Sequence, residues 1–315
     1  MTTMERPAVD DLARVRYASA NGIRIAYETF GDPSDPAILL VMGLGTQMIA
    51  WPDEMCSMLA EAGHHVVRFD NRDVGLSTHL DLPAPQPHEV VLRRRRPPYT
   101  VSDMANDAVG LLDALDIEAA HVVGASMGGF ISQTVALEHP SRVRSLTLVM
   151  TSTGSRRVGR PTPKVMARMA RRTAATSREA AIRDAIETYR VIGSPSHLDE
   201  DLVADIAGRS WDRAYDLSGT QRQLAAILAQ PDRTRRLAGI RVPTLVVHGL
   251  DDPLVTPSGG LALAKAIPGA TFIGHPGMGH DLPRTLWRSL ADDVLRLVES
   301  ADSEPLPGTP RWRRA

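Results

Sequence analysis

The sequence predicts an α/β fold with a doubly wound, mostly parallel sheet and a helical cap insertion. The first sign is a series of short apolar runs without polar alternation, which is typical of strands buried on both faces. These runs are Ala37–Met42, His65–Phe69, Ala120–Val123, Ser145–Met150 and Thr244–His248. Helical patterns separate them, and strands that alternate with helices form a parallel sheet with helices on both faces.

The second sign is the stretch Val122–Phe130, in which Gly-x-Ser-x-Gly stands between a strand and a helix. This arrangement is typical of a nucleophile elbow, a sharp turn that exposes a serine hydroxyl. Gly124 and Gly128 lack a Cβ, so strand and helix can cross closely around Ser126. The start of the helix adds backbone N–H groups and a positive dipole end. We therefore predict Ser126 as a nucleophile.

The strand pattern divides the chain into a core and an insertion. We expect the core at residues 15–150 and 242–300. Between them, residues 151–241 show no convincing buried strand but several amphipathic helical segments, among them Ala180–Val191 and Asp199–Arg209. We interpret residues 151–241 as a helical cap.

The first elements are expected to be two strands, Arg16–Ser19 and Ile23–Phe30, joined by a turn at Asn21–Gly22. A helix is then expected to begin near Pro52, because proline suits the first helical position. Gly63 is its expected stop.

Residues 79–100 form a long, proline-rich segment that contains Arg93–Arg96. Four arginines in a row can be a docking patch, but the neutral overall charge favours a solvated loop. Ser102 is expected to cap the following helix. Near the end of the chain we expect a helix at Ser258–Ala266 and a terminal helix at Pro283–Val298.

Composition excludes several function classes. The 315 residues carry 36 basic and 37 acidic side chains, so a net charge of −1 argues against a nucleic-acid partner. A single cysteine, Cys56, excludes an internal disulfide framework. No apolar run is long enough to span a membrane, and the first residues lack a signal-peptide pattern. We expect a soluble cytoplasmic protein with disordered tails at residues 1–14 and 301–315.

A serine hydroxyl needs an adjacent base, and histidine has a suitable pKa. Of the ten histidines, we favour His280, which lies in a glycine-flanked loop late in the chain. His275, at the start of that loop, is the alternative. The acid that orients the base is expected after Thr244–His248, where we favour Asp252 and interpret Asp251 as a turn residue.

A tetrahedral oxyanion needs two backbone N–H donors. One is expected from Met127, directly after the serine. The other is expected from Leu44, in the loop after the Ala37–Met42 strand, because Gly43 and Gly45 let that backbone turn inward.

The chain resembles the α/β-hydrolase fold esterases, in particular the bacterial aclacinomycin methylesterase-like group. The resemblance covers roughly residues 17–298. The motifs that carry it are Val41–Gly45, Trp51–Glu54, Arg68–Ser77, the elbow with Gly129, His248–Gly249 with Asp252–Pro253, and Gly277–His280. It implies Ser126, Asp252 and His280 as a catalytic triad, in the chain order of α/β-hydrolases, and Leu44 as the second oxyanion donor.

The sequence also departs from the family pattern. Many relatives have His where this chain has Met42, and the proline-bearing oxyanion loop of epoxide hydrolases is absent. Because the nucleophile is Ser rather than Asp, epoxide hydrolase and haloalkane dehalogenase activities are disfavoured. Carboxylic ester hydrolysis through an acyl-enzyme is the leading expectation.

The expected substrate is a hydrophobic small-molecule ester. An apolar pocket is predicted from the cap residues Trp211 and Tyr215 together with Met48 and Ile49, although such residues are as often cap core. Two alternatives stay open: a cofactor-free perhydrolase or lactonase with the same triad, and a ligand-binding module with slow turnover. No metal or nucleotide motif is present, so no cofactor is expected. The oligomeric state is not readable from the sequence.

Overall fold

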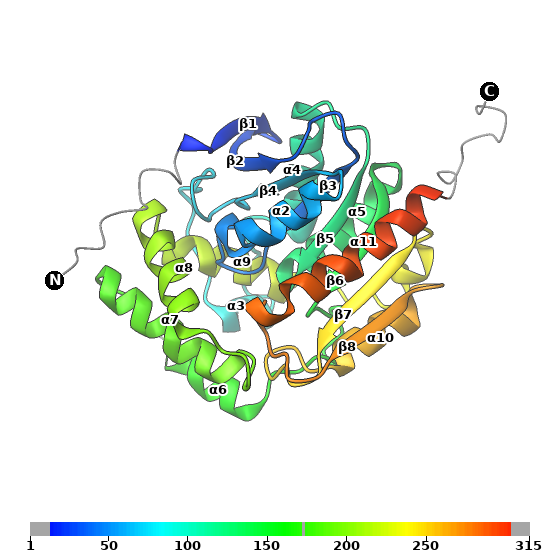
Figure 1. Ribbon diagram of the computed structural model, residues 1–315. Helices are drawn as coiled ribbons and strands as arrows, with labels where there is room; N and C mark the ends of the chain where they lie inside the picture. Colours follow the sequence, from blue (N-terminus) through cyan, green and yellow to red (C-terminus); the bar gives the residue numbers. More distant parts are fainter. Residues whose placement is uncertain (1–12, 172–173, 304–315) are drawn as a thin grey trace, which may run out of the picture.

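The computed structural model describes residues 13–171 and 174–303, and an eight-stranded sheet forms its centre (Figure 1). The strand order is β1-β2-β4-β3-β5-β6-β7-β8. The strands are β1 (Arg16–Ala20), β2 (Ile23–Phe30), β3 (Ala37–Val41), β4 (His65–Phe69), β5 (Ala120–Ala125), β6 (Val143–Val149), β7 (Thr244–Gly249) and β8 (Thr271–His275). β2 pairs antiparallel with β1 and β4, and every other pairing is parallel. The predicted mostly parallel α/β sheet is confirmed.

Helices cover both faces of this sheet. Those that alternate with strands are α2 (Asp53–Glu61), α3 (Pro87–Val91), α4 (Val101–Ala114), α5 (Met127–Glu138), α10 (Ser258–Ala266) and α11 (Trp287–Ser303). Short 3-10 helices are η1 (Met48–Ala50), η2 (Pro140–Arg142), η3 (Arg236–Gly239) and η4 (Arg284–Leu286). α2 and α11 lie on one face, and α4, α5 and α10 lie on the other (Figure 1).

Strand β3 shows why the stretches of sequence that form the buried strands are apolar at every position. Leu39 and Val41 belong to the core cluster under α4 and α5, whereas Ile38 and Leu40 belong to the cluster under α2 and α11. Side chains alternate between the faces of a strand, so a strand covered on both faces needs apolar residues at every position. All four of these side chains are buried completely.

Among the described residues between β6 and β7, four α-helices precede η3: α6 (Pro163–Ala170), α7 (Arg178–Ile192), α8 (Glu200–Arg213) and α9 (Leu217–Ala229). α7 and α8 correspond to the segments expected from amphipathic spacing, whereas α6 and α9 were not anticipated individually. α6, α7 and α8 stand together at one side of the sheet (Figure 1). The division of the chain into a core domain and a cap domain stays a prediction.

Three local expectations need correction. Thr100, not Ser102, caps α4: its hydroxyl accepts from the Asp103 amide, and the Asp103 carboxylate accepts from the Thr100 amide. The expected loop 79–100 contains α3. The terminal helix continues through residues 301–303, which were expected in a tail.

The remainder of the expected disordered tails, residues 1–12 and 304–315, lies outside the described residues. In the part of the chain that is described, no helix combines the length and apolar character needed to cross a bilayer.

Replacement of Leu40 by Ala should remove about 2–5 kcal/mol from the free energy of unfolding, because it leaves a cavity between β3 and the helices behind it. Urea denaturation measures this loss. Leu261→Ala, at a side chain of α10 that is 53% exposed, is the control and should change the same quantity by no more than about 0.5 kcal/mol. Equal effects of the two substitutions would contradict the proposed double-sided core.

Candidate active site

The turn between β5 and α5 holds Ser126 in an unusual backbone conformation, with φ +54° and ψ −116°. Positive φ is costly for a residue with a side chain and persists only where the surroundings enforce it. A Cβ at Gly124 would collide with the Gly128 carbonyl, and a Cβ at Gly128 would collide with the Val41 carbonyl. The two glycines therefore let α5 start directly against β5 and β3.

Ser126, His280 and Asp252 form one continuous chain of hydrogen bonds. The Ser126 hydroxyl lies 3.0 Å from His280 Nε2, and His280 Nδ1 lies 2.8 Å from Asp252 Oδ2. Asp252 and His280 are 2% and 8% exposed, and they come from the loops that follow β7 and β8. A carboxylate can only accept, so the proton between the two side chains belongs to Nδ1. This leaves the Nε2 lone pair facing the serine hydroxyl.

The Asp252 carboxylate is oriented by its own loop. Its Oδ1 accepts from the backbone amides of Leu254 and Val255, both at 2.8 Å. These two bonds leave Oδ2 directed at the imidazole. The neighbouring Asp251 is exposed and instead accepts from the Gly277 amide at 2.7 Å, as expected of a turn residue.

The alternative histidine is engaged elsewhere. His275 Nε2 lies 3.0 Å from Asp293 on α11. His248, at the end of β7, is fully buried and its Nε2 donates to the Val255 carbonyl. Burial lowers the pKa of His248. Neither donates a hydrogen bond to the chain around Ser126, although His248 Nε2 lies 3.7 Å from Asp252 Oδ2.

The two predicted oxyanion donors belong to segments next to Ser126. A Cβ at Gly43 would lie 3.2 Å from Ser126 Cβ, so the loop that carries Leu44 runs directly beside the serine. Met127 is the first residue of α5, and the first amides of a helix have no partner within it. Within the described residues, the Leu44 amide donates no hydrogen bond.

Gln223 of α9, which the sequence analysis did not select, holds that loop in place. Its side-chain oxygen accepts from the Gly45 amide at 2.8 Å, and its side-chain nitrogen donates to the Arg72 carbonyl at 2.8 Å. The side chain is completely buried. A glutamine inside an amphipathic helical segment carries no signal that distinguishes it from a polar surface residue, so only the tertiary contacts reveal it.

The last residue of α7 and the segment that follows it hold the loop of His280 in a similar way. The His280 amide donates to the Ile192 carbonyl at 2.7 Å, and the Gly279 amide donates to the Ser194 hydroxyl at 2.9 Å. The Ser194 hydroxyl in turn donates to Asp281. Burial raises the pKa of Asp281.

Comparisons with known proteins give the family. Residues 36–283 match the family model described as the alpha/beta hydrolase fold. The chain belongs to the α/β hydrolase family. It is 30% identical to a rhodomycin D methylesterase from a Streptomyces strain, over 91% of this chain and 98% of the relative. It is also 30% identical to a putative carbamate hydrolase of Variovorax paradoxus, over 86% of this chain and 96% of the relative.

A solved structure agrees with these relatives. The enol-lactonase from Burkholderia xenovorans superposes on this hydrolase with a TM-score of 0.70 at 25% sequence identity. The superposition covers 90% of this chain and all of the lactonase chain. The expected resemblance to α/β-hydrolases and to the methylesterase group is confirmed.

The four predicted pocket residues of this hydrolase lie in two places. Met48 and Ile49 are buried in η1, which packs against α8. The Trp211 and Tyr215 rings stack on each other with centroids 4.6 Å apart. Tyr215 is 43% exposed, and its hydroxyl accepts from the Ala175 amide. A substrate contact of these residues stays a prediction.

Buried ion pairs join the helices of the insertion to the loop after β4. Arg213 at the end of α8 pairs with Asp70 at 2.7 Å, and Arg222 of α9 pairs with Asp73 at 2.8 Å. Each of these four side chains is at most 4% exposed. Asp70 also accepts from the Met48 amide. Removal of one partner would leave a buried charge uncompensated.

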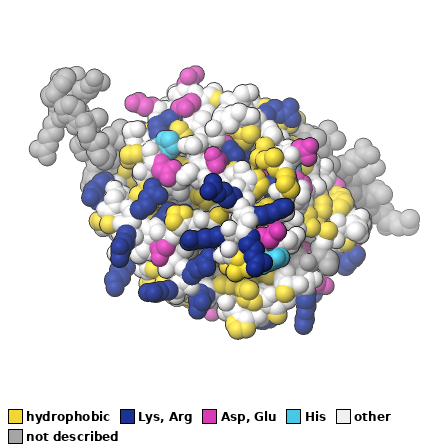
Figure 2. All heavy atoms as spheres, turned by 180° about the vertical axis from the view of Figure 1, so that it is seen from behind, with side chains coloured by type: hydrophobic (Ala, Val, Ile, Leu, Met, Phe, Trp, Pro, Cys, Tyr) yellow, Lys and Arg dark blue, Asp and Glu magenta, His cyan; other side chains and the backbone are white. Residues whose placement is uncertain are grey.

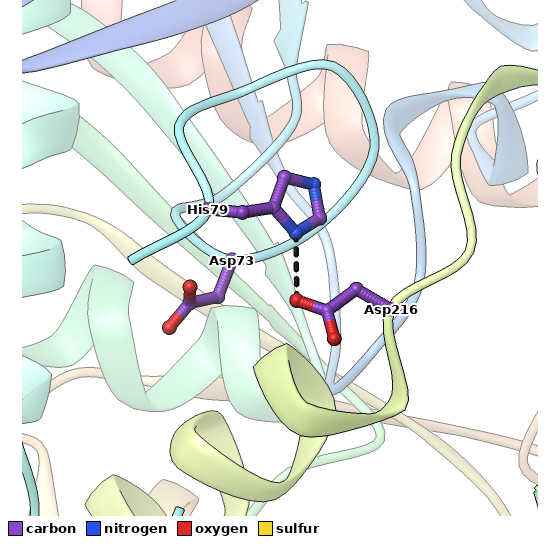
Figure 3. A group of neighbouring side chains, drawn as sticks. All are labelled: Asp73, His79 and Asp216. Carbon is purple, nitrogen blue, oxygen red and sulfur yellow. Dashed lines mark hydrogen bonds and ion pairs between the residues drawn. The ribbon is translucent and has the colours of Figure 1, made fainter. Parts of the chain in front are cut away.

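Asp73, His79 and Asp216 form a neighbouring cluster in which His79 points toward Asp216 (Figure 3). The three offer ligand atoms within 4.8 Å of one another, as a metal site would. However, the Arg222 guanidinium already binds both oxygens of Asp73 and lies 3.3 Å from Asp216. We therefore interpret the cluster as an ion-pair network.

The contacts of His79 in this network favour its cationic form. Its Nδ1 lies 2.9 Å from Asp216 and its Nε2 lies 2.8 Å from the Gly75 carbonyl, so both ring nitrogens face acceptors. Burial alone lowers the pKa of His79, but the hydrogen bonds to Gly75 and Asp216 outweigh it and raise the pKa overall. The bonds from Ser218 and His79 outweigh burial at Asp216 and lower its pKa to about 2.

A raised pKa means that the folded state binds the His79 proton more tightly than the unfolded state does. The stabilisation is therefore complete below the ordinary pKa of 6.5 and is lost as the pH rises through the raised value. The Tm difference between wild type and His79→Gln should thus be largest under mildly acidic conditions and shrink under alkaline ones. His88→Gln, at an exposed histidine of α3, is the control and should show a flat difference. A constant difference for His79→Gln would exclude a charged His79.

Proposed function

We propose that this protein is a serine hydrolase that cleaves carboxylic esters of hydrophobic small molecules, with Ser126 as its nucleophile. The observation that carries the proposal is the hydrogen-bonded chain from Ser126 through His280 to Asp252. A serine, a base and an orienting acid within hydrogen-bond reach are the geometry of nucleophilic catalysis. The family and the methylesterase relatives make the protein a hydrolase of the esterase type.

In the first half of the proposed reaction, Ser126 Oγ attacks the ester carbonyl carbon while His280 Nε2 takes its proton. Asp252 stabilises the imidazolium and keeps its orientation. The carbonyl oxygen becomes an oxyanion that accepts from the Leu44 and Met127 amides. His280 then returns the proton to the departing alcohol, which leaves an acyl group on Ser126.

In the second half, water attacks the acyl carbonyl and His280 takes one of its protons. A second oxyanion forms at the same two amides, and its collapse releases the carboxylic acid. The proton passes back to Ser126 Oγ. Each oxyanion donor is expected to contribute about 10²–10³ to the rate.

The proposed substrate is a methyl or other small alkyl ester of an apolar acid. The names of the methylesterase relatives support the methyl ester, and the apolar side chains predicted to line the site support the apolar acid. The enol-lactonase with the same fold favours a second candidate, the opening of a lactone. A lactone is a cyclic ester, so the same steps open it and the alcohol stays attached to the product.

Adjacent aspartates provide a matched test of the triad. Wild type should hydrolyse p-nitrophenyl acetate, butyrate or octanoate with repeated turnover, and Ser126→Ala should abolish it. Asp252→Asn should lower kcat by about 10³–10⁴, because the imidazole loses its orientation and its counter-charge. Asp251→Asn, one residue away, should change kcat by less than about three-fold, since the Asp251 carboxylate accepts only from the Gly277 amide and an Asn side chain keeps an acceptor there. Turnover that survives Ser126→Ala, or equal losses in the two aspartate variants, would refute this assignment.

Gln223 offers a test of the oxyanion loop. Gln223→Leu should lower kcat by about ten-fold or more with little change in KM, because the Gly45 amide loses its acceptor and the Leu44 donor loses its position. Gln223→Glu keeps an acceptor for Gly45 and should retain more of the rate. Gln221→Leu, at an exposed glutamine on the same helix, is the control and should leave kcat and KM unchanged. A loss confined to KM in Gln223→Leu would place the residue in substrate binding instead.

A further inference from the structure

A basic depression of about 820 Å³ lies outside the site described above. Three segments far apart in the sequence line it: the end of α3, the loop after β6 and the loop after α9. The lining residues are Val91, Arg93, Gly154, Ser155, Arg156, Arg157, Gln230, Pro231, Asp232, Thr234 and Arg235. Seen from behind, the molecule carries many Lys and Arg side chains across its middle (Figure 2).

Charge in the depression is strongly unbalanced. Arg93, Arg156, Arg157 and Arg235 are exposed, and none of them forms a salt bridge within the described residues. Asp232 is the one acid of the lining, and its carboxylate accepts from the Thr234 hydroxyl and amide. The whole chain has a net charge of −1, so this local excess of positive charge is not a property of the protein as a whole.

A fifth arginine, Arg233, lies behind the wall of the depression and is only 2% exposed. Its Nη1 donates to Gln230 at 2.6 Å, its Nε donates to Gln133 at 3.3 Å, and its Nη2 has no hydrogen-bond partner. That Nη2 would lie 3.7 Å from a Cβ at Gly154, a residue of the lining. Burial, followed by the nearby Arg236, lowers the pKa of Arg233 to about 10.

The surroundings of Arg233 point to an anion. In the described part of the chain no carboxylate forms a salt bridge with this guanidinium, which rests on the Phe130 ring instead. The Glu138 and Asp232 carboxylates act on Arg233 without forming a salt bridge with it, and they only partly offset the effect of burial. A buried charge without a counter-charge in direct contact is costly. Negative charge in the depression would lie near Arg233 on the side of Gly154 and would bind the exposed guanidinium groups directly.

We propose that this depression binds a small organic polyanion that carries two or more phosphate or carboxylate groups. The planar guanidinium group of arginine binds either a phosphate or a carboxylate through two parallel hydrogen bonds. Several guanidinium groups around one depression therefore suit a ligand that carries several phosphates or carboxylates. The volume is within the range of small-molecule sites. None of Ser126, Asp252 and His280 lines this site. Arg93, which belongs to the run of four arginines Arg93–Arg96, would contribute to binding the polyanion.

Calorimetric titration with inorganic pyrophosphate and with citrate tests the proposal, because the two probes separate phosphate from carboxylate recognition. At least one should bind wild type, more weakly at high ionic strength because exposed charges are screened. Arg156→Ala/Arg157→Ala should weaken that binding at least about ten-fold. Ser126→Ala should bind like wild type, which separates this site from the proposed hydrolysis.

Arg16→Ala/Arg288→Ala is the matched control, since it removes the same charge from exposed positions on β1 and α11. It should leave the affinity within about two-fold of wild type. Failure of both probes to bind wild type would overturn the proposal. Equal weakening in the two double variants would also overturn it, because the attraction would then be a general charge effect.

Discussion

The close crossing of α5 over β3 and β5 fixes the position of everything else in the site. Only residues without a Cβ fit at Gly124 and Gly128, and the chain between them must take the positive φ seen at Ser126. The Ser126 hydroxyl is therefore held at the carboxyl edge of the sheet by backbone packing. The loops after β3, β7 and β8 reach it because parallel strands end at the same edge.

The helical insertion takes part in this architecture through polar contacts, most of them buried. Gln223 accepts from Gly45, Ile192 accepts from the His280 amide, and Arg213 neutralises Asp70. Such contacts depend on direction and distance, and each costs free energy if one partner is lost. The insertion thus helps to set the geometry of the two loops that flank Ser126.

Much of this arrangement could be predicted from local sequence. The apolar runs gave the strands because burial on both faces leaves a continuous signal, and the glycines around Ser126 identified the elbow. The same reasoning selected the three residues that the structure joins by hydrogen bonds, Ser126, His280 and Asp252. Gln223 could not be found in this way because its partners, Gly45 and Arg72, lie far away in the sequence. The burial of Arg233 likewise depends on contacts with Gln133 and Phe130 of the distant helix α5. The cap of α4 was misplaced since Thr100 and Ser102 are both good capping residues, and only the reciprocal bond of Asp103 distinguishes them.

The hydrogen bond from the His280 amide to Ile192 has a consequence for protein engineering. Exchange of the segment between β6 and β7 with that of a related hydrolase would remove this contact. This segment contains Ile192, whose carbonyl accepts from the His280 amide, and Gln223, whose side chain accepts from the Gly45 amide. A transplanted segment must reproduce both acceptors at the same positions to keep the geometry of these two loops.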